Sequence, residues 1–174
     1  MEGKIEEERL FGGVVFFPKT LLPSNAGEDL AIAVVRERNR LSEALKEHGV
    51  ILFRGFDVGS AEDFSRVVEA FRWDEMGYVG TTTLVKMANL VFSANENPLD
   101  RSINFHHEMA LVTSFGDGSE IPREAMDAYK GILEENCVDL KWKKGDVLLV
   151  DNLSVQQARR PGKPPWAIYV SMCI

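Results

Sequence analysis

Cysteine, histidine and long apolar runs are all scarce in this chain of 174 residues. Its two cysteines, Cys137 and Cys173, lack the short spacing of a zinc knuckle and are too few for a disulfide framework. Such sparse cysteine is typical of a reducing compartment, so we expect a cytoplasmic protein. No stretch approaches the about 20 apolar residues of a membrane-spanning helix, and the charged first ten residues do not resemble a secretory signal.

Positive charge is in deficit as well. The chain has 20 Lys and Arg residues against 27 Asp and Glu residues, which gives a formal net charge of -7. Nucleic acids and anionic membranes favour a basic face, so we expect neither as a partner. Small molecules or other proteins are the expected partners, with a small-molecule substrate if the protein is an active enzyme. With 45% hydrophobic residues and no internal repeat, residues 1–174 are expected to form a single domain.

Apolar spacing predicts an α+β chain. Helices are predicted over 28–48, 60–71 and 122–136, and strands over 13–18, 50–53, 84–93, 138–142, 147–150 and 167–173. Gly49 is the predicted end of the first helix, and Ser60 with Asp63 a predicted capping box of the second. We expect strands 138–142 and 147–150 to form a hairpin. The third helix is expected to turn one side to the core, with Met126, Tyr129, Leu133 and Cys137.

Two of the three histidines lie beside an acidic residue in the segment NFHHEMA, residues 104–110. His106 and Glu108 are two positions apart, and in an extended strand such residues point to the same face. An imidazole nitrogen and a carboxylate oxygen could then bind one cation, as two members of a 2-His-1-carboxylate iron site. The alternative is structural, because a histidine is often simply paired with a carboxylate or exposed.

The order of several further segments resembles a known family. These segments are VILFRGF (50–56), FSANE (92–96), FHHEMA (105–110), GDVLLVDN (145–152) and ARRP (158–161). They resemble the TauD/TfdA-like Fe(II)/2-oxoglutarate-dependent dioxygenases, and most closely the plant clavaminate synthase-like branch. The resemblance implies a double-stranded β-helix, or jelly-roll, with a metal site at the mouth of its barrel.

What the resemblance implies for chemistry is decarboxylation of 2-oxoglutarate at Fe(II), coupled to oxidation of a second, unidentified substrate. His106 and Glu108 match the first two metal ligands of the family, with Glu in a place more often taken by Asp. His107 has no ligand role in that pattern. The implied activity is that of an oxidoreductase, with Fe(II) and 2-oxoglutarate as its cofactors.

The sequence departs from the family pattern at two site positions. Gln157 stands where the family has its distal histidine, and a neutral amide binds ferrous iron more weakly than imidazole. Ala167 stands where the family has the arginine that holds the distal carboxylate of 2-oxoglutarate. The guanidinium group that would bind this carboxylate through two N–H groups is therefore missing. Arg159 and Arg160 are expected to be a solvated surface pair.

A third departure is one of length. Glu108 and Gln157 are 49 positions apart, whereas relatives place far more chain between these landmarks. A central block is therefore expected to be absent near residues 113–116, which predicts an incomplete jelly-roll with flanking helices. Unpaired strand edges would then favour self-association.

Three hypotheses about function follow. The first is a dioxygenase in which Gln157 or water completes the metal site. The second is a catalytically inactive family member, truncated or splice-derived, that acts as an interaction module or has no function. The third is a cupin-like protein that binds a metal or small molecule without redox chemistry. The losses at Gln157 and Ala167 favour inactivity on chemical grounds.

Overall fold

The structure is a computed structural model, and it describes the chain except for residues 1, 78–83, 95–97, 99, 109–113 and 164–166. The elements in chain order are β1 (Arg9–Phe11), β2 (Val15–Phe17), β3 (Lys19–Leu21), α1 (Leu30–His48), β4 (Val50–Phe53), α2 (Ala61–Phe71), β5 (Lys86–Ala88), β6 (Val91–Ser93), β7 (Ile103–His106), α3 (Arg123–Asn136), β8 (Val147–Val150), β9 (Gln157–Arg159) and β10 (Tyr169–Val170). This mixture confirms an α+β chain.

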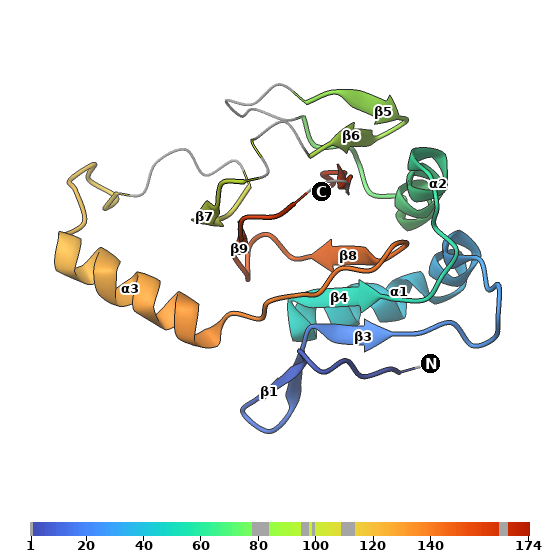
Figure 1. Cartoon of the computed structure of the whole chain (residues 1–174), viewed down its shortest axis with the longest axis horizontal. Coiled ribbons are helices and arrows are strands. Elements are labelled where there is room, and N and C mark those ends of the chain that lie inside the picture. The colour runs from blue at the N-terminus through green and yellow to red at the C-terminus, as the bar shows by residue number, and fades with distance from the viewer. Residues whose placement is uncertain (1, 78–83, 95–97, 99, 109–113, 164–166) are drawn as a thin grey trace.

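The core lies around β4, whose four residues are all buried. β4 pairs in parallel with β3 and antiparallel with β8, and α1 crosses behind this sheet (Figure 1). The continuous apolar run of β4 is therefore covered on both faces, which is the pattern of a buried strand. The main core cluster contains Leu30, Ala31, Val34, Leu41, Ile51, Phe53, Phe56, Val67, Ala70, Phe71 and Val147.

Both ends of α1 are set by local chemistry. The Asp29 side chain accepts a hydrogen bond from the Ile32 amide at 3.2 Å. At the other end Gly49 adopts a left-handed φ of 73°, and its amide donates to the Leu45 carbonyl at 2.7 Å. Glycine adopts the left-handed backbone conformation at the lowest free-energy cost because it has no Cβ. The prediction that the helix ends at Gly49 is confirmed.

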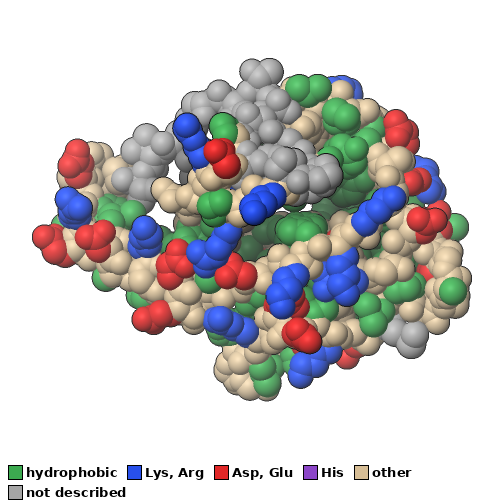
Figure 2. Space-filling view, in the orientation of Figure 1, with side chains coloured by type: hydrophobic (Ala, Val, Ile, Leu, Met, Phe, Trp, Pro, Cys, Tyr) green, Lys and Arg blue, Asp and Glu red, His purple; other side chains and the backbone are tan. Residues whose placement is uncertain are grey.

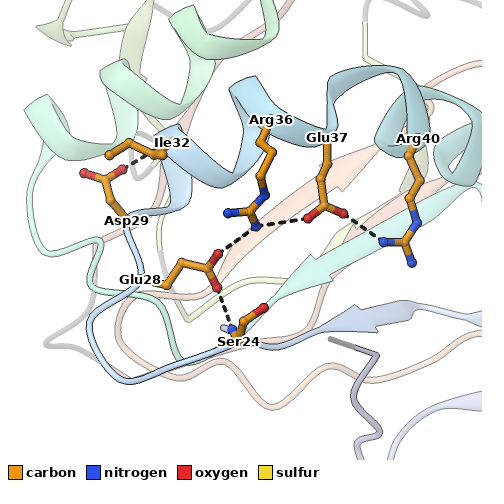
Figure 3. A network of polar contacts seen from close by, with 7 residues as sticks. All are labelled: Ser24, Glu28, Asp29, Ile32, Arg36, Glu37 and Arg40. Carbon is orange, nitrogen blue, oxygen red and sulfur yellow. Dashed lines mark hydrogen bonds and ion pairs between the residues drawn. The ribbon is translucent and has the colours of Figure 1, made fainter.

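The exposed side of α1 carries a chain of charges. Arg36 bridges Glu28 and Glu37 at 2.8 and 3.0 Å, and Arg40 continues the chain to Glu37 at 2.8 Å (Figure 3). Exposed ion pairs contribute about 0–1 kcal/mol each, so burial of the opposite face does most to hold this helix. Acidic and basic side chains are also interspersed over the face of the molecule in Figure 2.

Ser60 is the N-terminal cap of α2, as the predicted capping box requires, and Asp63 accepts from the Gly59 amide at 3.2 Å where a full capping box would use the Ser60 amide. Ser60 Oγ accepts a hydrogen bond from the Asp63 amide at 3.1 Å and donates one to Asp63 Oδ2 at 3.0 Å. Val67, Val68 and Phe71 of this helix are buried, so its apolar side faces the core. Local sequence signals and apolar spacing therefore agree here.

A buried ion pair joins the end of β4 to the turn before β8. Arg54 Nη2 lies 2.6 Å from Asp146 Oδ2, and Arg54 Nε donates to Asp146 Oδ1 at 3.0 Å. The Asp146 side chain is 1% exposed and the Arg54 side chain 10%. Both segments belong to the family-like motifs, and this bidentate contact gives them a structural role.

One predicted strand is absent, and two others differ from the prediction in burial or length. Residues 138–142 form no strand, and β8 pairs with β4 instead of closing a hairpin with them. The strand predicted over 13–18 is found as β2, which pairs with β1 in a partly exposed hairpin. The strand expected over 167–173 shrinks to β10. For β8 and β10 the partner strands, β4 and β6, are distant in the sequence, and local patterns do not encode such pairing.

The predicted core side of α3 was also wrong. The helix itself is present, but none of its residues is buried, and it lies apart from the sheets in Figure 1. Arg160 reaches it through ion pairs to Glu134 at 3.1 Å and to Asp139, just past the helix, at 2.8 Å. Amphipathic spacing predicted a helix correctly but could not say whether a partner surface exists.

The described strands form four small sheets and no closed barrel. Their orders are β1-β2, β10-β6-β5, β3-β4-β8 and β7-β9. The junction predicted near residues 113–116 lies partly outside the described residues. Among the helices of the described chain, none has an apolar stretch long enough to cross a membrane.

Candidate metal site

Strands β7 and β9 bring the histidine motif to the distant Gln157. They pair antiparallel, with Ile103 opposite Arg159 and His106 opposite Gln157, and the register shifts between these two pairs. Glu108 follows in a turn, because β7 ends at His106. The expected single strand through both His106 and Glu108 was therefore wrong, although the two side chains still meet.

The Glu108 carboxylate lies at the centre of the site. Its Oε1 is 3.5 Å from His106 Nε2, and the same oxygen accepts a hydrogen bond from Gln157 Nε2. The side chains of His106 and Glu108 are 34% and 28% exposed. The structure thus brings together all three residues that the sequence assigned to a metal site.

The His106 ring is oriented by a backbone carbonyl. Its Nδ1 lies 2.7 Å from the Asn104 carbonyl oxygen, which can only accept a hydrogen bond. Nδ1 therefore carries a proton, and Nε2 turns toward Glu108. In a neutral ring, the lone pair of Nε2 faces carboxylate lone pairs, so the gap between them favours a second proton or a cation.

This contact shifts both pKa values. Hydrogen bonding to Glu108 raises the pKa of His106, with partial burial acting in the opposite direction. Hydrogen bonding to His106 lowers the pKa of Glu108, again against the effect of burial. Each group stabilises the charged form of the other, and Gln157 adds a smaller lowering of the Glu108 pKa.

Asn152 holds the turn that carries Glu108. Its Oδ1 accepts from the Glu108 amide at 2.8 Å, and its Nδ2 donates to the Glu108 carbonyl at 3.3 Å. The Asn152 carbonyl oxygen in turn contacts Nδ1 of His107. Sequence reasoning assigned no function to Asn152, although its place after β8 in a family-like segment was a usable signal.

Two of the three side chains at this site suit a divalent cation as ligands. An imidazole nitrogen and a carboxylate suit ferrous iron, whereas the Gln157 amide offers only a neutral oxygen. In the present arrangement the Gln157 nitrogen faces Glu108, so its oxygen would have to turn before it could bind a metal. Within the described residues, no group of three or more His, Cys, Asp and Glu could hold a metal ion.

The predicted position of the 2-oxoglutarate anchor offers no charged group. Ala167 is exposed, and the three residues before it lie outside the described part of the chain. A methyl side chain cannot bind a carboxylate. Any cation that holds a carboxylate near this site has to come from elsewhere in the chain.

Comparisons with known proteins place these segments in a family context. Residues 85–166, which include β7 and β9, match the family described as taurine catabolism dioxygenase TauD, TfdA family. The chain is 50% identical over 80 residues to a clavaminate synthase-like protein of Arabidopsis thaliana, over 45% of this chain and 24% of that protein. It is 30% identical over 95 residues to the dapdiamide synthesis protein DdaC of Enterobacter agglomerans, over 54% of this chain and 29% of that protein.

The resemblance predicted from the sequence is confirmed by these matches. The chain matches less than a third of the length of either relative.

Proposed function

We propose that the chain is an Fe(II)/2-oxoglutarate-dependent dioxygenase-like oxidoreductase with a small-molecule substrate, because residues 85–166 match the family described as taurine catabolism dioxygenase TauD, TfdA family. The observation that carries this proposal is the contact of His106 with Glu108, opposite Gln157 in the β7–β9 pair. The 3.5 Å between the imidazole nitrogen and the carboxylate oxygen is close to the separation of two neighbouring ligands on one metal ion. The identity of the substrate does not follow from these contacts.

Four residues of the chain would bind or position the metal. His106 Nε2 and a Glu108 oxygen would bind the metal, and the Asn104 carbonyl would keep the His106 proton on Nδ1. Asn152 would hold the Glu108 backbone in place through its two hydrogen bonds. Iron, when bound, supplies oxidative decarboxylation of 2-oxoglutarate and oxidation of the second substrate.

A second candidate function is that of a catalytically inactive family member. Two observations favour it: the Gln157 amide donates to the Glu108 oxygen that a metal would use, and Ala167 is an exposed methyl group. A metal would have to displace that hydrogen bond without gaining an imidazole in return. An inactive member would act as an interaction module or have no function.

The proposal extends to fold, partners and location. The four small sheets would be the remainder of a family jelly-roll that lacks a central block, and β8, an edge strand among the described residues, would be open to pairing. Self-association through such edges is the expected form of assembly. A cytoplasmic location fits the sparse cysteines.

One experiment separates the two candidates. Under anaerobic conditions, Fe(II) and 2-oxoglutarate should produce a visible charge-transfer band, and oxygen should then release succinate. An active dioxygenase gives both signals. Absence of the band and of succinate, in protein shown by circular dichroism to be folded, would reject the dioxygenase and support the inactive member. A band without succinate would indicate metal and cosubstrate binding without turnover.

A further inference from the structure

His107 lies between the two candidate ligands, and its side chain contacts a distant segment. Its Nδ1 meets the backbone carbonyl oxygen of Asn152, which is 45 positions away in the sequence. The neighbouring ring of His106 instead contacts the Asn104 carbonyl and the Glu108 carboxylate. The two adjacent imidazoles therefore have different partners, and the role of His107 is separate from that of His106.

The contact of His107 is a hydrogen bond in which the imidazole donates. A carbonyl oxygen can only accept, so the His107 Nδ1 carries the proton. The bond lies in a partly buried place, where a backbone carbonyl that loses its donor is not fully compensated by water. The bond therefore favours one orientation of the Asn152 peptide group.

Asn152 contacts the same turn a second time through its side chain. Its Oδ1 accepts from the Glu108 amide at 2.8 Å, and its Nδ2 donates to the Glu108 carbonyl at 3.3 Å. One asparagine thus makes three hydrogen bonds with two consecutive residues, His107 and Glu108. We call these three bonds the Asn152 clasp. Bonds that share one residue support one another, because each restricts the groups that form the others.

The clasp is fixed to the buried sheet by the residue before Asn152. Asp151 directly follows β8, and its amide donates to the Gly49 carbonyl at 2.9 Å. The Asp151 side chain also accepts from the Leu153 amide at 3.0 Å. Both neighbours of Asn152 are thus held, so the core determines the place of Asn152 and the clasp determines the place of Glu108.

We propose that His107 is a positioning residue for Glu108 and acts through Asn152. Its hydrogen bond orients the Asn152 peptide group, the Asn152 side chain orients the Glu108 backbone, and the Glu108 carboxylate then faces His106. Partners of this kind, which do not bind the metal themselves, determine how a ligand is presented. The inference rests on the proposed function only in treating Glu108 as a metal ligand, because the clasp forms without metal.

The first measurement is hydrogen exchange at the Glu108 amide, followed by NMR on the metal-free full-length protein in EDTA. This N–H donates to Asn152 Oδ1, so its protection reports on the clasp. His107→Phe keeps a ring but removes the donor, and protection should fall by at least about tenfold. His107→Asn places an N–H near the position of Nδ1 and should keep protection within about threefold of the parent.

The second measurement is the chemical shift of the Gln157 side-chain amide protons in the same samples. Gln157 Nε2 donates to the Glu108 carboxylate, so this signal reports where the carboxylate lies. It should move toward the value of a solvated amide in His107→Phe and stay near the parent value in His107→Asn. The matched control is Ser65→Ala, which removes another side-chain donor to a carbonyl, that of Asn89 at 2.6 Å. Both signals should be unchanged in this control, apart from about a twofold change in exchange.

Three results would overturn the proposal. They are an unprotected Glu108 amide in the parent protein, unchanged signals in His107→Phe, and equal changes in His107→Phe and Ser65→Ala. If His107→Phe does not fold by circular dichroism, the parent protein decides through the ¹⁵N shifts of the His107 ring. A proton on Nδ1 supports the proposal, and a proton on Nε2 alone overturns it. Because all measurements are made without metal, failure here is distinct from absence of the iron-dependent signals.

Discussion

The region around β4 and the region around β7 are stabilised by different interactions. β4 is completely buried between two neighbouring strands and the first helix, with Ile51 and Leu52 at 0% exposure. The β7–β9 pair is only partly buried, and polar side chains make its main long-range contacts. Stability and candidate chemistry thus reside in different parts of the chain. Substitutions at the candidate metal site should change metal binding more than the free energy of unfolding. Substitutions in the core should change the free energy of unfolding more than metal binding.

The largest expected effect is loss of the acid that pairs with Arg54. Asp146→Ala leaves a guanidinium without its carboxylate in a largely buried place, and we expect a loss of about 3–5 kcal/mol in the free energy of unfolding. The matched control is Asp139→Ala, whose ion pair with Arg160 is exposed and should contribute less than about 1 kcal/mol. Urea denaturation measures both. Equal losses would show that the two regions do not differ as described.

A second comparison uses one substitution at two isoleucines. Ile51→Ala should destabilise the chain by about 2–5 kcal/mol, because it opens a cavity in the buried sheet. Ile132→Ala on α3 removes a side chain that is 58% exposed, so the change should stay within about 0.5 kcal/mol. Thermal and urea unfolding give both values. A large cost at Ile132 would mean that α3 is covered in solution, for example by a second copy.

A third prediction concerns the incomplete ligand set. Gln157→His replaces a neutral amide by an imidazole opposite His106, and we expect Co(II) or Fe(II) to bind at least about tenfold more tightly. Its unfolding free energy without metal should change little, since the site is partly exposed. Metal titration followed by absorption measures the affinity. The control is Gln157→Ala, which removes the amide without adding a ligand.

No gain from Gln157→His alone would indicate that more than one ligand is missing. The double variant Gln157→His and Ala167→Arg then tests whether point losses account for the site. Tighter 2-oxoglutarate binding by the double variant than by the parent would attribute the defect to these two positions. No recovery would attribute it to the block predicted to be absent.

The sequence predicted well where a few neighbouring residues decide the structure. Ser60 and Asp63 satisfy each other within one helical turn, and Gly49 ends α1 through its own φ angle. The strand over 50–53 was also predicted correctly, because a run of four apolar residues favours a strand that is buried on both faces. These features depend little on the rest of the chain.

The sequence failed where a distant partner decides the structure. The partner of β8 is β4 and not residues 138–142, and α3 is amphipathic although the described chain provides nothing to bury it. At the site, the family resemblance selected the residues, but it could not indicate that Glu108 lies in a turn held by Asn152. Local sequence patterns therefore carried no information about which distant segments pair with each other.

The smallest expected effect is the pH dependence of the His106–Glu108 contact. The raised pKa of His106 means that its contribution is complete below the reference value of 6.5 and is lost as pH rises through the folded value. The lowered pKa of Glu108 means that its contribution is present above 4.5 and is lost as pH falls through its folded value. The pair therefore stabilises the metal-free protein most between these limits, by less than about 1 kcal/mol given its exposure.

NMR titration of the His106 ring in EDTA checks this contact directly. Glu108→Gln should lower the pKa of His106, because its main cause of elevation is removed. Glu124→Gln, on the exposed α3, is the control and should leave it unchanged. If Glu108→Gln has no effect on the His106 titration, the two side chains do not meet in solution. The β7–β9 region would then lack even the two-residue site, and its family-like segments would serve the fold alone.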